Sequence, residues 1–498
     1  MGAIETGIGM VLHWNVILTI VVASAFGLVV GAIPGLTATM AIALLVPITF
    51  FMEPIPAVGA MIACSAMAIF AGDIPSTLMR MPGTPASAAY TEECYAMTRK
   101  GEAQVALGAN VLFSAVGGLF GTAVLIVSAP LLAEVALGFS SFEYFWLALL
   151  GLMCAIFIGT GSPVKGLLSL FLGLFVASIG IDNPAGVPRF TFGNAELLGG
   201  VDFIPAMIGL FAVSEVLRAM ASGAPDWEVK QTSLGNPLKG WGRMLVKYWP
   251  QQVRGNVTGT AIGILPGAGA DIAAWVSYAM SRKFSKTPEK FGTGHVEGII
   301  ESTSANNAAL AGAWVPALVF GIPGDSITAV VIGVLYLKGL NPGPTLFLNN
   351  PESIYAVFTI FILANLAMIP LGLVAVKAGT ALLRVPRRLM MPIILLFCMV
   401  GSYAVNNSVY GIVLMLVFGV LGFLMEEHEV PIAPCVLGIV LGKLLEDSFV
   451  TSMIKADGNL LAFFERPVAA GLGVVTLLVL VLPLVQAARR RRVVAPAP

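Results

Sequence analysis

The stretch "VPALVFGIPGDSITAV" (315–330) interrupts a long apolar region with Pro323, Gly324 and Asp325. Proline removes a backbone donor and clashes with the preceding turn, and glycine weakens a helix further. In hydrocarbon every freed N–H and C=O group needs a partner, so irregular backbone persists there only inside protein or along a cavity. A helix broken beside a carboxylate is therefore expected to carry a function.

The composition is that of an integral membrane protein. The 498 residues are 57% hydrophobic and 11% charged, with a mean hydropathy of +0.91, whereas soluble domains carry about 25% charged residues. Apolar runs of spanning length recur, and membrane barrels are excluded because these runs do not alternate. We predict an all-α polytopic bundle with roughly twelve transmembrane segments. Examples of the runs are 16–33, 137–159, 356–376 and 468–485.

Several classes of function are disfavoured. A net charge of zero gives no support for a nucleic-acid partner. The five cysteines form no C-x-x-C pair and the three histidines are isolated, so we expect no metal cluster and no cofactor. No basic region precedes the first apolar run, which argues against a cleavable signal peptide. No polar segment is large enough for a soluble enzyme domain.

The broken stretch has a counterpart earlier in the chain. "IPSTLMRMPGTPASAA" (74–89) matches residues 315–330 at an offset of 241, and "GAIPGLTATMAIA" (31–43) matches "GILPGAGADIAAW" (263–275) at an offset of 232. Two ordered pairs with similar flanks indicate a duplicated half. The domains that we predict are a first membrane repeat (1–220), a cytoplasmic polar linker (221–254), a second membrane repeat (255–488) and a basic cytoplasmic tail (489–498). Within the linker, 241–254 could form an interfacial amphipathic helix.

Loop charges indicate that the two halves are inverted. Cytoplasmic loops are enriched in Lys and Arg. The turn 50–56 has no basic residue, while its counterpart 282–290 has four. The bias reverses after the second break of each half. The loop 91–104 carries two basic residues, whereas its counterpart 338–353 carries only one. Inverted repeats with broken helices or re-entrant hairpins are typical of secondary transporters.

The breaks predict a binding site. The N-terminus of a half-helix offers free N–H groups and positive dipole to an anion, while carboxylates and unwound carbonyls suit a cation. We expect Asp271, Asp325 and Asp73 to serve a coupling Na⁺ or H⁺. The predicted substrate-binding residues are Pro34, Gly35, Thr37, Thr39, Pro82, Gly83, Thr84, Ser87, Pro266, Gly267, Gly269, Asn306, Asn307, Pro323, Gly324, Ser326 and Thr328.

Structural alternatives stand beside these assignments. Each Pro-Gly could be a simple kink or a loop at the membrane edge, and Asp271 or Asp325 could be an N-cap. The two asparagines could be hydrogen-bonding contacts between helices. Arg80 could meet a substrate carboxylate, but pairing with Asp73 or a position at the interface is the preferred interpretation. The glycine-rich "GTGHVEG" (292–298) does not fit a nucleotide-binding loop, because no strand precedes it.

Several long blocks resemble the large membrane subunit of the bacterial tripartite tricarboxylate transporters. They are "GAIPGLTATMAIALLVPITF" (31–50), "MPGTPASAAYTEECYAMTRKGEAQVALG" (81–108), "LPGAGADIAAWVSYAMSRKFSKTPEKFGTGHVEGIIESTSANNAALAGAWVPALVFGIPG" (265–324) and "GLNPGPTLF" (339–347). The resemblance implies a carboxylate transporter driven by an ion gradient in the bacterial inner membrane. It also implies two partners, a small membrane subunit and a periplasmic substrate-binding protein. The acidic "GDIPSTLMR" (72–80) departs from the family pattern.

We therefore expect a permease that works by alternating access, with scaffold candidates at 105–127, 143–161 and 389–426. Two alternatives stay open. A channel would conduct without ion coupling. An intramembrane aspartyl protease would need Gly-x-Gly-Asp and Tyr-Asp motifs, whereas this chain has "GIPGD" (321–325) and no Tyr-Asp.

Overall fold

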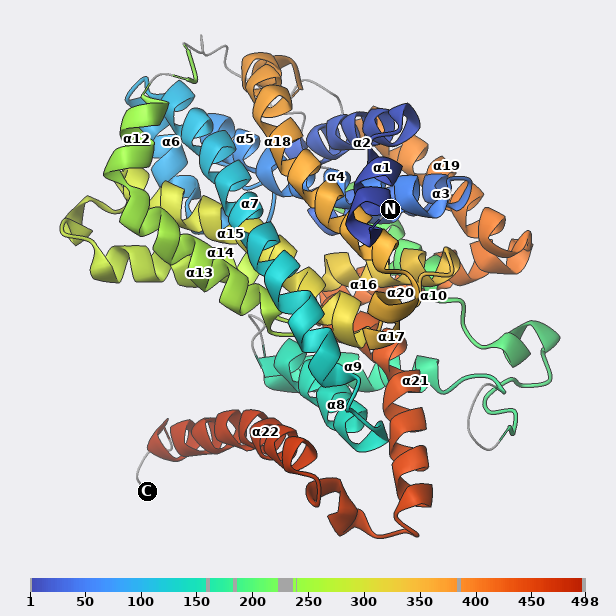
Figure 1. The fold of residues 1–498 in the computed structure, drawn as a ribbon. Helices are drawn as coiled ribbons and strands as arrows, with labels where there is room; N and C mark the ends of the chain where they lie inside the picture. Colours follow the sequence, from blue (N-terminus) through green and yellow to red (C-terminus); the bar gives the residue numbers. More distant parts are fainter. Residues whose placement is uncertain are drawn as a thin grey trace. The chain divides into compact units, whose positions relative to one another are not determined.

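The computed structural model describes residues 2–157, 162–181, 186–222, 236–238, 240–382 and 387–494, and these residues are helical apart from loops and one isolated bridge between Gly180 and Arg189 (Figure 1). The expectation of an all-α membrane protein is confirmed. Six described helices are long and apolar enough to cross a membrane: Trp14–Ala32, Pro54–Met79, Ala103–Ala136, Phe203–Ala221, Pro351–Ala378 and Val409–Glu427. Shorter apolar helices cover Ala38–Phe50, Ser141–Ile156, Pro163–Ala177, Ser326–Leu337, Met391–Val405 and Pro467–Val481. The predicted number of crossings stays a prediction.

The chain divides into two compact units, which do not coincide with the two sequence halves. Unit 1 comprises Met1–Glu134 and Phe203–Leu424, and unit 2 comprises Val135–Asp202 and Met425–Pro498. All predicted site residues belong to unit 1. Of the predicted linker, 223–235 and 239 lie outside the described residues, as do the side chains of the basic tail.

Unit 1 contains four helix pairs interrupted at the four predicted breaks. The pairs are α2 (Trp14–Ala32) with α3 (Ala38–Phe50), α4–α5 (Pro54–Ala71, Asp73–Met79) with the short η1 (Ser87–Ala89) and α6 (Thr91–Arg99), α13 (Trp249–Ile264) with α14 (Gly269–Phe284), and α15 (Val296–Phe320) with α16 (Ser326–Leu337). Because α3 and α16 have 13 and 12 residues, each is about 20 Å long, against a hydrocarbon core of about 30 Å. These helices are too short to cross a membrane alone.

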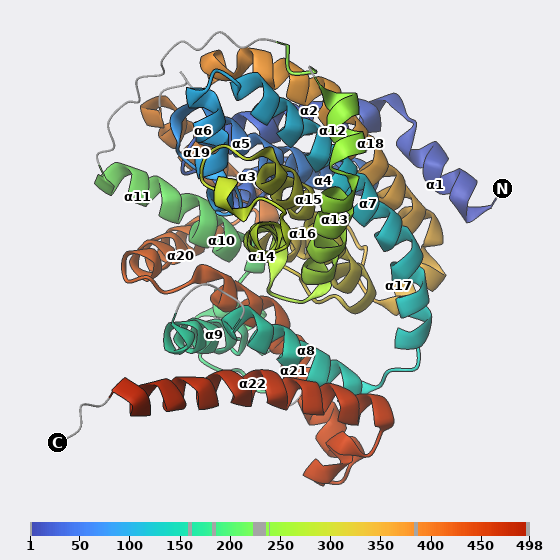
Figure 2. The same cartoon turned by 90° about the vertical axis from the view of Figure 1, so that its left-hand side faces the viewer.

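Glycines allow the long helices to cross at backbone contact. A Cβ on Gly27 or Gly31 of α2 would overlap the backbone of Cys64 or Ala68 in α4. The same contacts occur between α13 and α15, where Gly259 and Gly263 face Ala305 and Ala309. The two pairs of glycines are related by the offset of 232, and their partners by the offset of 241, as in the sequence comparison. Figure 2 shows α13, α14 and α15 side by side.

Two long helices pack on these pairs. Gly117 and Gly121 of α7 (Ala103–Ala136) lie against the backbone of Ser304 and Ala308 in α15. Helix α18 (Pro351–Leu382) packs on α2 and α4. The remaining helices of unit 1 are α1 (Ala3–Val11), α10 (Phe203–Met207), the π-helical η3 (Ile208–Val213), α11 (Ser214–Ser222), α12 (Trp241–Lys247), η4 (Pro288–Lys290), α17 (Pro344–Asn349), α19 (Arg387–Asn406) and α20 (Val409–Glu427).

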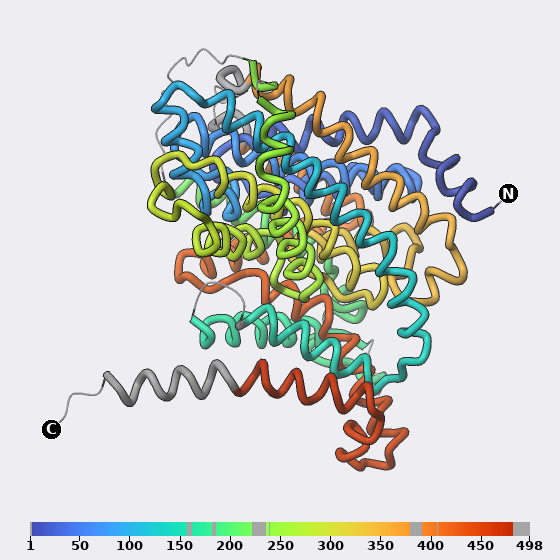
Figure 3. Tube along the Cα trace, turned by 60° about the vertical axis from the view of Figure 1, so that its left-hand side comes forward, coloured from blue at the N-terminus to red at the C-terminus, as the bar shows by residue number. Residues whose placement is uncertain are grey.

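Unit 2 is built from α8 (Ser141–Phe157), α9 (Pro163–Ala177), η2 (Ala195–Gly199), α21 (Ile432–Lys455), η5 (Leu460–Phe464) and α22 (Pro467–Val494). The coloured part of α22 runs beside α8 in Figure 3. The rings of Phe145, Phe449 and Phe463 pack against one another, and the indole of Trp146 donates to the Phe463 carbonyl at 2.9 Å. An aromatic core therefore holds this unit together.

Candidate functional site

Two of the breaks end their helices with the same left-handed cap. Arg80 (φ +59°) follows α5 and Gly321 (φ +67°) follows α15. In both, the chain then folds back, since Met81 N–H donates to Pro75 O and Ile322 N–H to Pro316 O, each at 3.3 Å. A left-handed residue with such back-bonding is a common C-cap. The two turns are related by the offset of 241.

The next residues form two matching reciprocal caps. The Asp325 amide donates to Thr328 Oγ1 at 2.9 Å, and the Thr328 amide to Asp325 Oδ1 at 2.8 Å. Thr84 and Ser87, which correspond to them at the same offset, exchange the same two bonds at 3.1 and 3.2 Å. Asp325 thus serves as the N-cap of α16, the structural alternative considered from the sequence.

The other two breaks turn on glycines with positive φ. Gly35 (φ +87°) and Gly267 (φ +80°) are related by the offset of 232, and both follow a proline. Thr37 then caps α3 by accepting the Met40 amide at 3.2 Å. Helix α14 has no side-chain hydrogen bond at its N-cap. Unlike α3 and α16, α14 therefore begins with backbone amides that no side chain of its N-cap residue binds.

Contacts between the breaks close a ring. Within the first half, a Cβ on Gly83 would stand 2.9 Å from the Gly31 carbonyl. Within the second half, Gly267 N–H donates to the Gly324 carbonyl at 2.8 Å.

Two further contacts join the halves: Thr39 Oγ1 lies 3.0 Å from Ser326 Oγ, and the Ala86 amide donates to Asp271 Oδ1 at 3.0 Å. Each break is thus joined to two others, so the four breaks form one continuous set, which we call the break ring.

Two carboxylates lie in the break ring without a basic partner. Asp271 is exposed to solvent in the first turn of α14, and Asp325 is half-buried. They are close enough for their charges to repel each other. In the described part of the chain, no Lys, Arg or His forms an ion pair with either. A cation between them would relieve this repulsion.

Most predicted site residues lie in the ring, but only some are accessible. The accessible ones are Gly35, Thr37, Pro82, Pro266, Gly267, Asp271, Asp325 and Ser326. The buried ones are Pro34, Thr39, Gly83, Thr84, Ser87, Gly269, Pro323, Gly324 and Thr328. The buried set holds the turns, and the accessible set lies at least partly at the surface of the described structure.

Asn306 and Asn307 do not belong beside a break, which corrects the sequence interpretation. Both are buried in the middle of α15. Asn306 lies 14 residues before the helix ends at Phe320, which is about 21 Å along the axis. Asn307 Nδ2 contacts Met368 Sδ of α18 at 3.7 Å, as a contact between helices would.

Arg80 does not pair with Asp73, which was one of the alternatives that the sequence left open. Arg80 contacts Glu92 at 2.9 Å, and both side chains are 59% exposed. Asp73 instead accepts a hydrogen bond from the Tyr90 hydroxyl at 2.6 Å, and both residues are buried. The left-handed turn at Arg80 points its side chain outward, where solvation of the charge costs least.

Sequence reasoning missed Glu93, which fixes the glycine-rich loop. This fully buried carboxylate accepts amide hydrogens from Gly292, Gly294 and His295 and the Tyr278 hydroxyl. The loop 292–295 therefore surrounds the carboxylate of Glu93, which lies 199 to 202 residues earlier in the sequence. The glycines in "GTGHVEG" were the only signal that backbone approaches a group there.

Two lysines make related contacts between the halves. Lys338, after α16, donates to the carbonyls of Phe50 and Met52 after α3, at 2.8 and 2.6 Å. Lys100, after α6, donates to the Thr293 carbonyl after α14 at 2.6 Å. Burial lowers the pKa of the Lys338 amine from its ordinary value. Each lysine ties the end of one broken element to the opposite half.

Comparison with known proteins identifies the family. The model of the tripartite tricarboxylate transporter TctA family matches residues 17–437. A protein of Agrobacterium vitis, described as an uncharacterized 52.8 kDa protein in the TAR-I ttuC' 3' region, is 34% identical over 468 residues, covering 94% of this chain and 92% of that one. A second, from the TAR-II ttuC' 3' region of the same organism, is 33% identical over 234 residues, covering 46% of this chain and 97% of that one. No solved structure matches.

The matched family is a family of transporters and not of enzymes, so the intramembrane protease interpretation is excluded. The long apolar helices agree with a multi-pass membrane subunit. The chain belongs to the tripartite tricarboxylate transporter TctA family, of which it is a large membrane subunit.

Proposed function

We propose that this chain is the permease of a binding-protein-dependent secondary transporter that imports carboxylates by alternating access, coupled to a Na⁺ or H⁺ gradient. The break ring is the observation that carries this proposal. It gathers unwound backbone, hydroxyl groups and two unpaired carboxylates on elements from both halves. Broken helices that meet in this way suit simultaneous binding of an anion and a cation.

The substrate carboxylate would bind at the N-terminus of α14. This helix has no side-chain hydrogen bond at its N-cap and has 16 residues, so its first amides and its dipole favour an anion. The hydroxyls of Thr37 and Ser326 are accessible and would orient further oxygen atoms. At the start of α16 the substrate would compete with the Asp325 side chain, which makes that end the weaker anion site.

The two acidic residues would couple the ion to the substrate. A substrate carboxylate about 4 Å from Asp271 would be repelled by about 4 kcal/mol at an effective dielectric constant of 20. A monovalent cation bound by Asp271 and Asp325 would offset one of their two negative charges and so reduce this repulsion. The anion would then bind well only when the cation is present, which is the condition for symport.

The matching offsets support two inverted repeats. The helix crossings, the left-handed caps and the reciprocal caps recur at offsets of 232 or 241. Contacts between the halves also come in nearly related pairs, Thr39 with Ser326 and Asp271 with Ala86. Thr39 corresponds to Asp271, and Ser326 corresponds to Pro85, the residue before Ala86. Such pairing is expected when a pseudo-two-fold axis relates the halves, and the loop charges favour an axis in the membrane plane.

The assembly would include two partners that the family implies, a small membrane subunit and a periplasmic substrate-binding protein. The binding protein would capture the carboxylate and deliver it to this chain in the bacterial inner membrane. The basic residues of "RRRR" (489–492) would keep the C-terminus in the cytoplasm.

Uptake of a panel of labelled carboxylates tests the proposal, in cells that make the chain with both partners, with and without a Na⁺ gradient. We expect saturable, binding-protein-dependent uptake, which Asp271→Asn or Asp325→Asn uncouples from the gradient. Asparagine is also a good N-cap, so Asp325→Asn should keep the fold. The exposed Asp457→Asn in unit 2 is the matched control. Conductance without saturation would favour a channel instead.

A further inference from the structure

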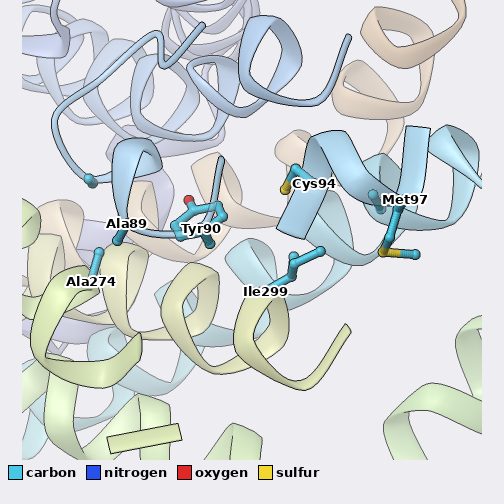
Figure 4. Close-up of a cluster of buried hydrophobic side chains, with 8 residues drawn as sticks. Ala89, Tyr90, Cys94, Met97, Ala274 and Ile299 are labelled. Carbon is cyan, nitrogen blue, oxygen red and sulfur yellow. The ribbon is translucent and has the colours of Figure 1, made fainter. Parts of the chain in front are cut away.

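Asp73 is a carboxyl group enclosed in an apolar span. It begins α5 within the candidate span Pro54–Met79 and is 1% exposed. The Tyr90 hydroxyl donates to Oδ1 at 2.6 Å, and Oδ2 is buried without a hydrogen-bond partner. Figure 4 shows Tyr90 beside Ala89 and near Ala274 and Ile299, which belong with it to a cluster of buried, mostly apolar side chains.

In the part of the chain that the structure describes, no Lys, Arg or His forms an ion pair with Asp73. Helix α5 packs on α2, α4, η1 and α6, and the first three contain no Asp, Glu, Lys, Arg or His. Of the charged groups on α6, Glu92 pairs with Arg80, Glu93 is held by the loop 292–295, and Arg99 lies over the Tyr95 ring. The titratable groups that face Asp73 are Tyr90 and Cys94, and both are ordinarily neutral near pH 7.

An ionised carboxylate in these surroundings would be strongly disfavoured. A charge buried without a partner takes up a proton instead of remaining ionised. A metal cation would need several oxygen ligands, whereas the described side-chain hydrogen bonds of Asp73 are limited to the one from Tyr90. We propose that Asp73 is a proton-binding site that is occupied, and therefore neutral, in this conformation.

The site lies directly against one break of the ring. Gly72, the preceding residue, accepts the Gly83 amide on its carbonyl at 3.1 Å, and a Cβ on Gly83 would stand 2.6 Å from Gly72 Cα. A charge that appears at Asp73 would need water or a counter-charge, and either would displace this contact. At the matching position of the second half, Trp314 is buried, so the first half alone carries this proton site.

In coupling, which rests on the proposed function, Asp73–COOH would release H⁺ to water and become Asp73–COO⁻ once the surroundings of α5 open. The proton would return from the opposite side. Asp271 and Asp325 would then be left to bind the cation or the substrate within the ring. The ligand of Asp73 is thus H⁺.

Infrared spectroscopy of the purified full-length chain tests the inference without any transport step. We expect a C=O stretch of a protonated carboxylic acid near neutral pH, lost in Asp73→Asn and retained in Asp271→Asn. Tyr90→Phe should keep the band and shift it to higher frequency, because one hydrogen bond to the carboxyl group is removed. An unchanged band in Asp73→Asn would overturn the proposal. If that variant fails to fold, an unshifted band in Tyr90→Phe would overturn it equally.

Uptake gives a second readout. Asp73→Asn should lose any stimulation by an inward proton gradient, whereas Asp457→Asn should respond as the wild type does. Stimulation retained in Asp73→Asn would count against a coupling role. Absence of carboxylate uptake in every variant would contradict the proposed function and would leave the infrared result standing by itself.

Discussion

Replacing Glu93 by Gln should destabilise the protein far more than the same change at its neighbour Glu92. The two oxygens of Glu93 each accept two hydrogen bonds. Oε1 accepts the Gly292 amide and the Tyr278 hydroxyl, and Oε2 accepts the Gly294 and His295 amides at 2.8 and 2.7 Å.

The magnitude follows from the count of lost bonds. A Gln side chain presents –NH₂ where one oxygen stood, so two donors lose their acceptor and face another donor. Hydrogen bonds to charged groups contribute about 1.5–3 kcal/mol each, and two of them give about 3–6 kcal/mol. Glu92 is 59% exposed and contacts only Arg80 among its described ion pairs, and such surface pairs are worth about 0–1 kcal/mol.

Denaturation of the purified chain in a mixed-detergent titration, followed by tryptophan fluorescence, measures both changes. We expect the free energies of unfolding of the two variants to differ by several kcal/mol. Losses of equal size would refute the reasoning that the loop 292–295 is held by a buried carboxylate. Limited proteolysis within 285–295 should also become faster in Glu93→Gln alone.

Three further changes test other contacts. Gly259→Ala should lower the free energy of unfolding by about 1–3 kcal/mol in the same titration, because the new methyl group overlaps α15. The control Gly242→Ala, whose new methyl group would have no heavy atom within 4 Å, should stabilise its helix by about 0.5–1 kcal/mol. Equal effects of the two changes would contradict the close packing of α13 on α15. Thr328→Val should cost about 0.5–2 kcal/mol by removing the reciprocal cap with Asp325, seen as faster hydrogen exchange at the start of α16, and unchanged exchange would refute the cap. Lys338→Met should expose the turn after α3 to proteolysis, because the amine no longer holds its carbonyls; unaltered cleavage would show that the lysine contributes nothing there.

The positions of the breaks could be predicted from the sequence because proline and glycine act locally. Pro-Gly at 34–35, 82–83, 266–267 and 323–324 ends or begins a helix at each place. The two offsets also gave the register in which Thr84 corresponds to Asp325. The same register is seen in the reciprocal caps. The Thr84 hydroxyl accepts the Ser87 amide just as the Asp325 carboxylate accepts the Thr328 amide.

The contacts between halves could not be predicted, because they depend on how helices far apart in sequence pack. Thr39 and Ser326 are 287 residues apart, and Ala86 and Asp271 are 185 apart. The contact of Arg80 with Glu92 could not be predicted for a similar reason, since a left-handed turn decides where the Arg80 side chain points. The position of Asn306 inside α15 could have been predicted, because no Pro-Gly pair lies between it and the break at 323–324.

Alkylation of Ser326→Cys by a small maleimide shows whether the break ring binds a carboxylate. The native cysteines of the described residues are all buried, so the introduced thiol should dominate labelling. Ser408→Cys, half-exposed between α19 and α20, is the matched control outside the ring. We expect a transported carboxylate together with its coupling ion to slow alkylation at position 326 severalfold and to leave alkylation at position 408 unchanged. Equal labelling rates at position 326 with and without every carboxylate of the panel would contradict the claim.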